Sequence, residues 1–316
     1  MTSRREFVKS TILAGAGLAI GAYGKSAAFN TAAAPFSINI FSKNLQWLEY
    51  SGMANVAAEI GFEGIDLTVR PAGHVEPARV VEDLPKAVEA VRKAGLQVPM
   101  ITTAILSASE PNTETILKTA GALGVSSYRM GWMKYEDKIS IDDNLRKFEL
   151  EFKKLEALNK KCKIRGEYQN HSGAYLGSAV WDVAGLLKNC DPAWMGLQYD
   201  VLHATVEGAN AWPLGLKQAS SHVTSMPIKD FQWAKKAGKW AIELVPLGEG
   251  MVDFRKYFEL IKSLKISGPF SMHYEYPLGG AENGTKALTI DKAEVVSAMK
   301  KDLTKFREML SSAGIR

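Results

Sequence analysis

The residues of this chain best suited to chemistry are acidic, imidazole and amino side chains that recur where short apolar segments end. Residues 163–173 (KIRGEYQNHSG) have the character of a strand entering a polar loop. Because side chains alternate between the faces of a strand, Glu167, Gln169 and His171 should share one face. A row of polar groups is costly to bury without partners. This face is therefore expected to line a site, and the alternative is a solvated edge strand.

Three later segments end in the same kinds of residue. They contribute Asp200 and His203, then Lys229, and finally His273 and Glu275. Converging carboxylates and imidazoles suit a divalent cation such as Mn, Mg or Zn. The predicted metal ligands are Glu167, Asp200, His273 and Glu275. Such an ion would hold two neighbouring sugar oxygens and stabilise an enediolate.

The predicted catalytic roles follow from the ionisation of each side chain. Glu167 and Glu275 would serve as general base and acid across a substrate carbon. Lys229 would donate to a developing oxyanion, and His203 would be a metal ligand or the hydrogen-bond partner of one. Asp200 capping the next segment and Lys229 in a structural ion pair remain the alternatives. Metal-free catalysis by Lys229 and the imidazoles also stays open.

Amide, imidazole and aromatic side chains near these ends are predicted to bind a small carbohydrate. They are Gln169, His171, Trp132, Trp233 and Tyr276. Aromatic rings offer flat apolar faces to the C–H side of a sugar. Residues 231–250 exceed the usual length of a loop between strand and helix, and 235–239 (KKAGK) is typical of a hairpin turn. We therefore expect a lid or rim over the site.

The order of elements predicts a single-domain α/β fold, a (β/α)8 TIM barrel over residues 35–316. Expected strands alternate with segments of helical period. The strands are 37–41, 64–69, 97–103, 127–132, 164–171, 196–201, 222–229 and 270–275. A doubly wound open sheet competes, but no GxGxxG follows the first strand. In a barrel the active site lies at the carboxyl ends of the strands, where the polar residues above fall.

Residues 1–28 are predicted to be a twin-arginine signal peptide. Arg4 and Arg5 precede an apolar run and the small residues at 26–28. The alternative is an amphipathic start or a membrane anchor, but the apolar run is short for a membrane span. The protein is therefore expected in the periplasm or otherwise exported, with no stable membrane insertion after cleavage.

Charge and cysteine content narrow the partners further. Removal of residues 1–28 lowers the formal net charge from +5 to about +2. No stripe of Lys and Arg indicates nucleic-acid binding. Cys162 and Cys190 could form a disulfide or stay as two thiols, and two cysteines do not make a Cys-based metal site. The sequence does not indicate an oligomeric state.

Five motifs in order give the chain a resemblance to the xylose-isomerase-like TIM-barrel family, which includes sugar (phosphate) isomerases and epimerases. They are 61–67 (GFEGIDL), 169–171 (QNH), Asp200 with His203, 228–230 (IKD) and 247–254 (LGEGMVDF). The resemblance covers nearly all of the chain after the signal segment. It implies proton abstraction beside a carbonyl at a metal site built from Glu, Asp, His and Glu at the ends of strands five to eight.

Three departures from the family pattern affect the implied metal ligands. Gln169 stands where a Glu is usual, Pro227 where a His is usual, and His273 where the Glu of strand eight is usual. The resemblance thus implies an exported subgroup with altered ligand positions. The expected function is a sugar isomerase or epimerase acting on a non-phosphorylated sugar. A keto-sugar lyase or hydratase at the same site, or a non-catalytic carbohydrate-binding barrel, are the alternatives.

Overall fold

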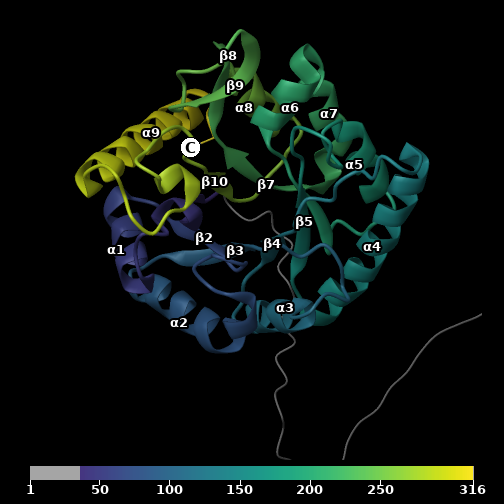
Figure 1. Cartoon of the computed structure of the whole chain (residues 1–316), viewed down its shortest axis with the longest axis horizontal. Coiled ribbons are helices and arrows are strands. Elements are labelled where there is room, and N and C mark those ends of the chain that lie inside the picture. The colour runs from purple at the N-terminus through teal and green to yellow at the C-terminus, as the bar shows by residue number, and fades with distance from the viewer. Residues whose placement is uncertain (1–35, 316) are drawn as a thin grey trace, which may run out of the picture. The chain divides into compact units, whose positions relative to one another are not determined.

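The computed structural model describes residues 36–315, so the predicted signal peptide lies outside the described residues. Eight parallel strands close a barrel in the order β1-β10-β7-β6-β5-β4-β3-β2 (Figure 1). They are β1 (Ile38–Phe41), β2 (Gly64–Thr68), β3 (Gln97–Thr102), β4 (Ser127–Arg129), β5 (Arg165–Gln169), β6 (Met195–Gln198), β7 (Val223–Ile228) and β10 (Phe270–Met272). The predicted (β/α)8 barrel is confirmed, and the open-sheet alternative is wrong.

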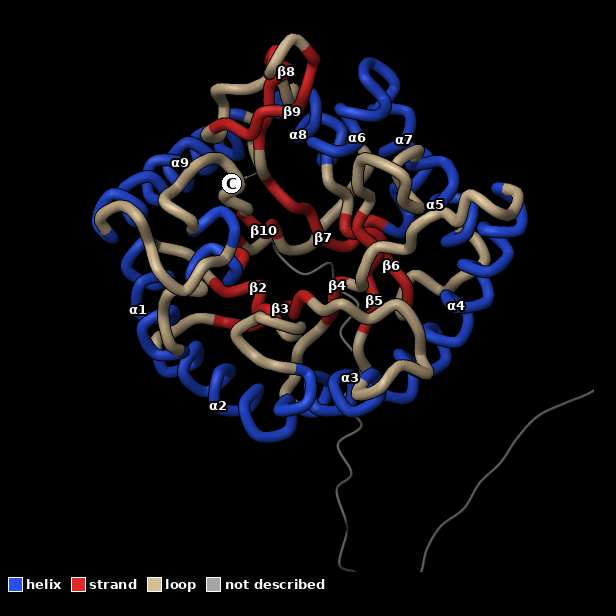
Figure 2. Tube along the Cα trace, in the orientation of Figure 1, coloured by secondary structure: helices blue, strands red, loops and turns tan. Residues whose placement is uncertain are grey.

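Helices surround the barrel on its outer side (Figure 2). They are α1 (Tyr50–Ile60), α2 (Val80–Lys93), α3 (Thr113–Ala122), α4 (Ile141–Cys162), α5 (Val180–Leu187), α6 (Val201–Gly208), α7 (Trp212–Ala219), α8 (Phe254–Ser263) and α9 (Lys292–Ser312). The sequence dictates this placement. In α2 the buried residues Val80, Leu84, Val88 and Val91 recur every three or four positions and form one apolar stripe.

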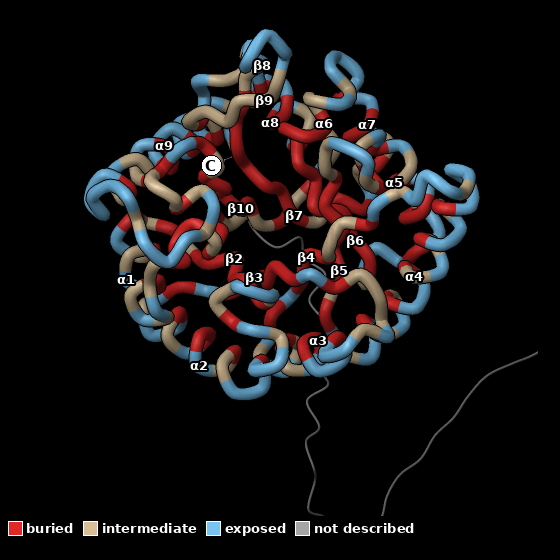
Figure 3. Tube along the Cα trace, in the orientation of Figure 1, coloured by how far each residue is buried: buried red, intermediate tan, exposed pale blue. Residues whose placement is uncertain are grey.

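Burial follows the barrel, whose strands are red in Figure 3 while the outer helix faces are exposed. Strands β1 and β2 are buried along their whole length, as parallel strands covered by helices should be. The interior nevertheless holds polar groups. Asp66 accepts hydrogen bonds from Thr102 Oγ1 and Ser271 Oγ, both at 2.8 Å. Ser225 Oγ donates to Glu167. These partners satisfy carboxyl groups that would otherwise be costly to bury.

Helix α6 was not predicted, and it changes the environment of Asp200. It starts at Val201, right after Asp200, whose side chain accepts the backbone N–H of His203 at 3.3 Å. Asp200 is therefore an N-cap, a position that aspartate favours. The first turn of α6 carries His203 back over the strand ends.

The predicted hairpin turn is confirmed. Strands β8 (Asp230–Lys236) and β9 (Lys239–Val245) pair antiparallel, with Lys236 opposite Lys239. Ala237 and Gly238 between them have φ of 49° and 79°, which matches the preference of two-residue hairpins for positive φ. In Figure 1 the hairpin lies at the outer edge of the barrel beyond β7 and not over its centre. Of the two predicted forms, a lid or a rim, the hairpin is a rim element.

Asp230 anchors both ends of this hairpin. Its carboxylate accepts the backbone N–H groups of Phe231, Gly248, Gly250 and Val252 at 2.9 to 3.2 Å. A Cβ atom at Gly250 would overlap the Asp230 carboxylate. Asp230 of the 228–230 motif therefore binds the backbone of the glycines in the 247–254 motif, and the two motifs have a shared structural role.

The structure also bears on the two cysteines and on the question of a membrane-spanning helix. Cys162 and Cys190 are free thiols, so of the two alternatives the structure contains the unbonded pair. Within residues 36–315, no helix has the length and apolar character needed to cross a membrane.

Candidate active site

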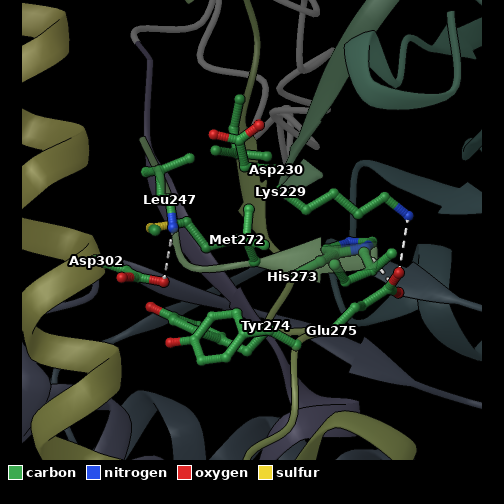
Figure 4. A pocket seen from close by; sticks show the side chains of 12 residues that line it. Lys229, Asp230, Leu247, Met272, His273, Tyr274, Glu275 and Asp302 are labelled. Atoms are coloured by element: carbon green, nitrogen blue, oxygen red, sulfur yellow. Dashed lines mark hydrogen bonds and ion pairs between the residues drawn. The ribbon is translucent and has the colours of Figure 1, made fainter. Parts of the chain in front are cut away.

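Lys229, the residue after β7, is the centre of the polar cluster at the strand ends. Its Nζ lies 3.1 Å from Glu275 Oε2, 3.3 Å from Asp200 Oδ2 and 3.0 Å from His203 Nε2. An ammonium has three donors and no acceptor, so all three have a partner here. Figure 4 shows Lys229 and His273 converging on Glu275, with the Lys229–Glu275 contact dashed.

The charges of Lys229 and Glu275 stabilise each other. Burial lowers the pKa of Lys229, but the carboxylates of Asp200 and Glu275 outweigh it, and the pKa is raised. Burial alone would raise the pKa of Glu275, yet the ammonium groups of Lys229 and Lys43 hold it well below its usual value. Lys43 Nζ lies 3.2 Å from Glu275 Oε1. At neutral pH the site therefore contains an ammonium and a carboxylate, not a neutral pair.

Three imidazoles border this pair, and each is neutral at neutral pH. Burial, and then the nearby Lys229, lower the pKa of His203 and His273 well below the usual value. Burial also lowers the pKa of His171, whose ring lies 3.8 Å from that of His203 between centroids.

Hydrogen bonds assign the protonated nitrogen of two of these rings. The ammonium of Lys229 only donates, so His203 Nε2 accepts and Nδ1 faces Ser172 Oγ at 3.0 Å. His171 Nδ1 lies 2.8 Å from the Ser172 carbonyl oxygen and must donate to it. This leaves Nε2 of His171 unprotonated.

An amide network holds Asp200 in place. Gln169 Nε2 donates to Asp200 Oδ2 at 2.8 Å, and Gln169 Oε1 accepts from Arg129 Nη1 at 2.9 Å. Asn170 clamps the backbone of the same residue, since its Oδ1 accepts the Asp200 N–H at 2.7 Å and its Nδ2 donates to the Asp200 carbonyl at 2.9 Å. The 169–171 motif thus positions the residue that orients Lys229 and His203.

The structure does not bring all predicted residues together. Glu167 and Gln169 belong to the same strand, but Glu167 lies deeper, where Ser225 donates to it and burial raises its pKa. The predicted place of Glu167 in the cluster is corrected accordingly. Trp132 does lie at the site, with its ring 4.5 Å from that of His171.

The other two predicted aromatic residues lie elsewhere. Trp233 is 41 % exposed on the hairpin and packs edge-on against Phe231. Tyr276 packs against Tyr274 and forms a hydrogen bond with Asp302 of α9. The cavity that Tyr276 lines together with Lys229, Glu275 and Asp302 has about 10 Å³, room for one water molecule and too little for a sugar.

The predicted metal ligands do not fit a metal ion as they are arranged. Within residues 36–315, no three His, Cys, Asp or Glu side chains are grouped so as to hold one. Asp200 and Glu275 are bridged by the ammonium of Lys229, and a cation between them would be repelled by it. Glu167 bonds Ser225 instead. The predicted ligand set is corrected to a lysine-centred cluster.

Asp66, below the site, makes stability depend on pH. Burial raises its pKa from 3.8 to about 6, against the opposing effects of Arg129, Ser271 and Thr102. A raised acid pKa means that the folded state binds this proton more tightly than the unfolded state, so its contribution to stability is lost as pH rises from about 4 to 6. We expect Asp66→Asn to gain about 2 kcal/mol relative to the wild type between pH 4 and pH 7.

Urea unfolding at pH 4, 5, 6 and 7 measures this difference. Asp137→Asn, at an exposed position, controls for the loss of a charge as such. Parallel pH profiles for Asp66→Asn and the wild type would contradict the assignment.

Comparisons with known proteins agree with this architecture. Residues 54–294 match the xylose isomerase-like TIM barrel family. No curated protein matches the chain. Among solved structures, L-ribulose 3-epimerase is similar with a TM-score of 0.67 at 14 % identity, over 88 % of this chain and 95 % of that one. D-psicose 3-epimerase from Clostridium cellulolyticum H10, with D-tagatose, has a TM-score of 0.64 at 11 % identity over 87 % and 99 %.

A 3-keto-D-glucoside 4-epimerase from E. coli is similar too, with a TM-score of 0.63 at 13 % identity over 86 % of this chain and 99 % of that chain. At such identities the likeness concerns the fold alone. The family match covers most of the barrel, and by it the chain belongs to the xylose isomerase-like TIM barrel family.

Proposed function

We propose that this protein is a sugar isomerase or epimerase that removes a proton beside a carbonyl of a non-phosphorylated sugar. The observation that carries the proposal is the Lys229 ammonium held 3.1 Å from the Glu275 carboxylate at the strand ends. The similar epimerases named above support this reaction class by analogy of fold. Export by the twin-arginine pathway, predicted from residues 1–28, is part of the proposal.

The charged pair supplies both groups that enolisation needs. The substrate carbonyl oxygen takes a hydrogen bond from Lys229 in place of Glu275. Lys229 then stabilises the negative charge that develops on this oxygen. Because Lys229 is the strongest of the charges that hold the Glu275 pKa down, losing this contact makes Glu275 more basic. One exchange of partners therefore polarises the carbonyl and activates the base.

The reaction then consists of proton transfers. Glu275 takes a proton from the carbon beside the carbonyl, and a carbon–carbon double bond forms as the carbonyl oxygen becomes an oxyanion. An isomer forms when Glu275 returns the proton to the former carbonyl carbon while the neighbouring hydroxyl gives its proton to the oxyanion. An epimer forms when water protonates the first carbon on the face opposite Glu275, the carbonyl re-forms, and Glu275 gives its proton to the hydroxide left by that water. Asp200 and His203 hold Lys229 during both steps, and the rings of Trp132 and His171 offer a flat face to the sugar.

Incubation of the purified protein with aldoses, ketoses and their keto and acid derivatives in D2O tests this proposal. Proton NMR is expected to show loss of the signal beside the carbonyl together with a new isomer or epimer. A dehydrated product would replace the proposal with the lyase alternative. Binding without exchange or product, for every sugar tried, would replace it with a carbohydrate-binding barrel.

A further inference from the structure

Two arginines lie near the strand ends, on strands other than those that carry the charged pair of Lys229 and Glu275. Arg70 follows β2 and Arg129 ends β4. Their guanidinium carbons lie 5.5 and 5.7 Å from the centre of the Phe41 ring at the end of β1. The Lys229 cluster comes from β6, β7 and β10, the other half of the strand order. The ring of His273 stacks on Phe41 at 4.5 Å and joins the two halves.

The arginines differ from the lysines of the site in their pairing. Lys43 and Lys229 both contact carboxylates. Arg129 is 3 % exposed and donates from Nη1 to the neutral amide of Gln169, while its buried Nε has no hydrogen-bond partner among residues 36–315. Neither guanidinium forms an ion pair with any of the residues 36–315, and the Arg70 guanidinium lies over the Phe41 ring.

Asp66 and Glu275 act on both arginines through space. Among residues 36–315 neither carboxylate forms an ion pair with Arg70 or Arg129, since Asp66 accepts from Thr102 and Ser271 and Glu275 pairs with Lys43 and Lys229. Burial, followed by the charge of Arg70, lowers the pKa of Arg129 to about 10. The structure therefore keeps two guanidinium groups close together in a poorly solvated place, where an added anion is strongly favoured.

Unsatisfied donors gather around the same point. Within the described part of the chain the buried Nε1 of Trp132 has no hydrogen-bond partner, and the Arg129 guanidinium lies 4.8 Å from the centre of the Trp132 ring. Two forked guanidiniums and an indole N–H match a group that presents several anionic oxygens. A carboxylate and a phosphate ester share this chemistry, and the carboxylate is preferred here because the proposed substrate is a non-phosphorylated sugar.

We infer that the substrate is a sugar acid whose carboxylate binds Arg70 and Arg129 while its carbonyl end reaches Lys229 and Glu275. The inference rests on the proposed function for the sugar part of the ligand. The anion site itself depends only on the two arginines. The inference specifies that the substrate carries a carboxylate, and it gives Arg70 and Arg129 the role of binding that carboxylate.

Three probes that differ only at C6 test the inference by isothermal titration calorimetry: D-glucuronate, D-glucose and D-glucose 6-phosphate. We expect the wild type to bind glucuronate at least tenfold more tightly than the other two, because charge-assisted hydrogen bonds are strong. Arg70→Gln should lose at least tenfold in glucuronate affinity. Arg129→Lys, which keeps the charge but not the fork, should also weaken binding.

Arg255→Gln is the matched control, because it removes an exposed arginine from α8. Thermal unfolding of each variant shows whether it folds, and Arg70→Gln decides the matter if the buried Arg129 variant does not. Glucose bound as tightly as glucuronate, no binding of glucuronate, or affinities unchanged in both variants would overturn the inference. Preference for the phosphate that depends on Arg70 would overturn the carboxylate assignment.

Binding does not require turnover, so this result is independent of the exchange experiment. Arginine-dependent glucuronate binding without solvent exchange would sustain the anion site and contradict the proposed reaction. Solvent exchange on a neutral sugar that Arg70→Gln does not change would support the proposed reaction and contradict the anion site.

Discussion

Replacement of Lys229 by methionine is expected to lower kcat/KM for the exchanging sugar at least a hundredfold and to destabilise the fold. Methionine keeps much of the length of lysine but donates no hydrogen bond. The loss of one donor to a developing oxyanion typically costs a factor of about 10² to 10³. The variant also leaves Asp200, which is fully buried, and Glu275 without their shared cation. Removal of one partner from a buried ion pair costs about 3 kcal/mol or more.

Kinetics and urea unfolding measure the two effects separately. The activity assays are run under conditions in which the urea unfolding curve shows the variant to be folded. A loss of activity then does not come from a loss of folded protein. Lys93→Met is the matched control, since Lys93 is 74 % exposed and pairs with Glu89 on the surface of α2. Surface pairs of this kind contribute little, so this variant should behave as the wild type. Full activity in Lys229→Met would remove the central group of the proposed mechanism.

Replacement of Glu275 by glutamine is expected to abolish most solvent exchange while leaving the fold intact. Proton transfer by a positioned side chain contributes about 10² to 10⁴ to a rate, and glutamine cannot take a proton from carbon. Its amide oxygen can still accept from Lys43 or Lys229, which now contact the two carboxylate oxygens at 3.2 and 3.1 Å. The buried ammonium also keeps Asp200 as its counter-ion. Stability should therefore change much less than in Lys229→Met.

Deuterium exchange followed by NMR gives the rate, and calorimetry with glucuronate gives the affinity. The affinity should be retained or improved, because the substitution removes an anion from the mouth. Glu89→Gln, an exposed position on α2, controls for the change of charge. Exchange at the wild-type rate in Glu275→Gln would move the role of base to another group. His171, whose Nε2 is unprotonated, would then be the next to test.

The sequence determined the architecture because local signals and length agreed with one fold. Strand and helix periods alternated eight times, and the Ala237–Gly238 turn marked the hairpin. Parallel strands of a closed barrel put their carboxyl ends at one rim. For that reason Asp200, His203, Lys229, His273 and Glu275 could be placed in one neighbourhood although they are far apart in the chain.

Tertiary structure alone decided how deep each side chain lies and what it contacts. Glu167 and Gln169 share a face of β5, yet two residues along a tilted strand separate an interior group from one at the mouth. Helix α6 was missed because its eight residues are short for a pattern of helical period, and its start fixes Asp200 and His203. Arg70 and Arg129 belong to no sequence motif, and only the structure shows that neither forms an ion pair with a carboxylate of residues 36–315.

The chemistry of the centre also came from packing and not from composition. Carboxylates and imidazoles in a sequence suit a metal ion, and the same residues accept equally well from an ammonium. Whether these carboxylates and imidazoles surround a metal ion or an ammonium depends on where a neighbouring strand places its lysine. Residue types and their order thus specify a barrel with a polar rim. Only the closure of that barrel, which fixes distances to within hydrogen-bond reach, put Lys229 between Asp200 and Glu275.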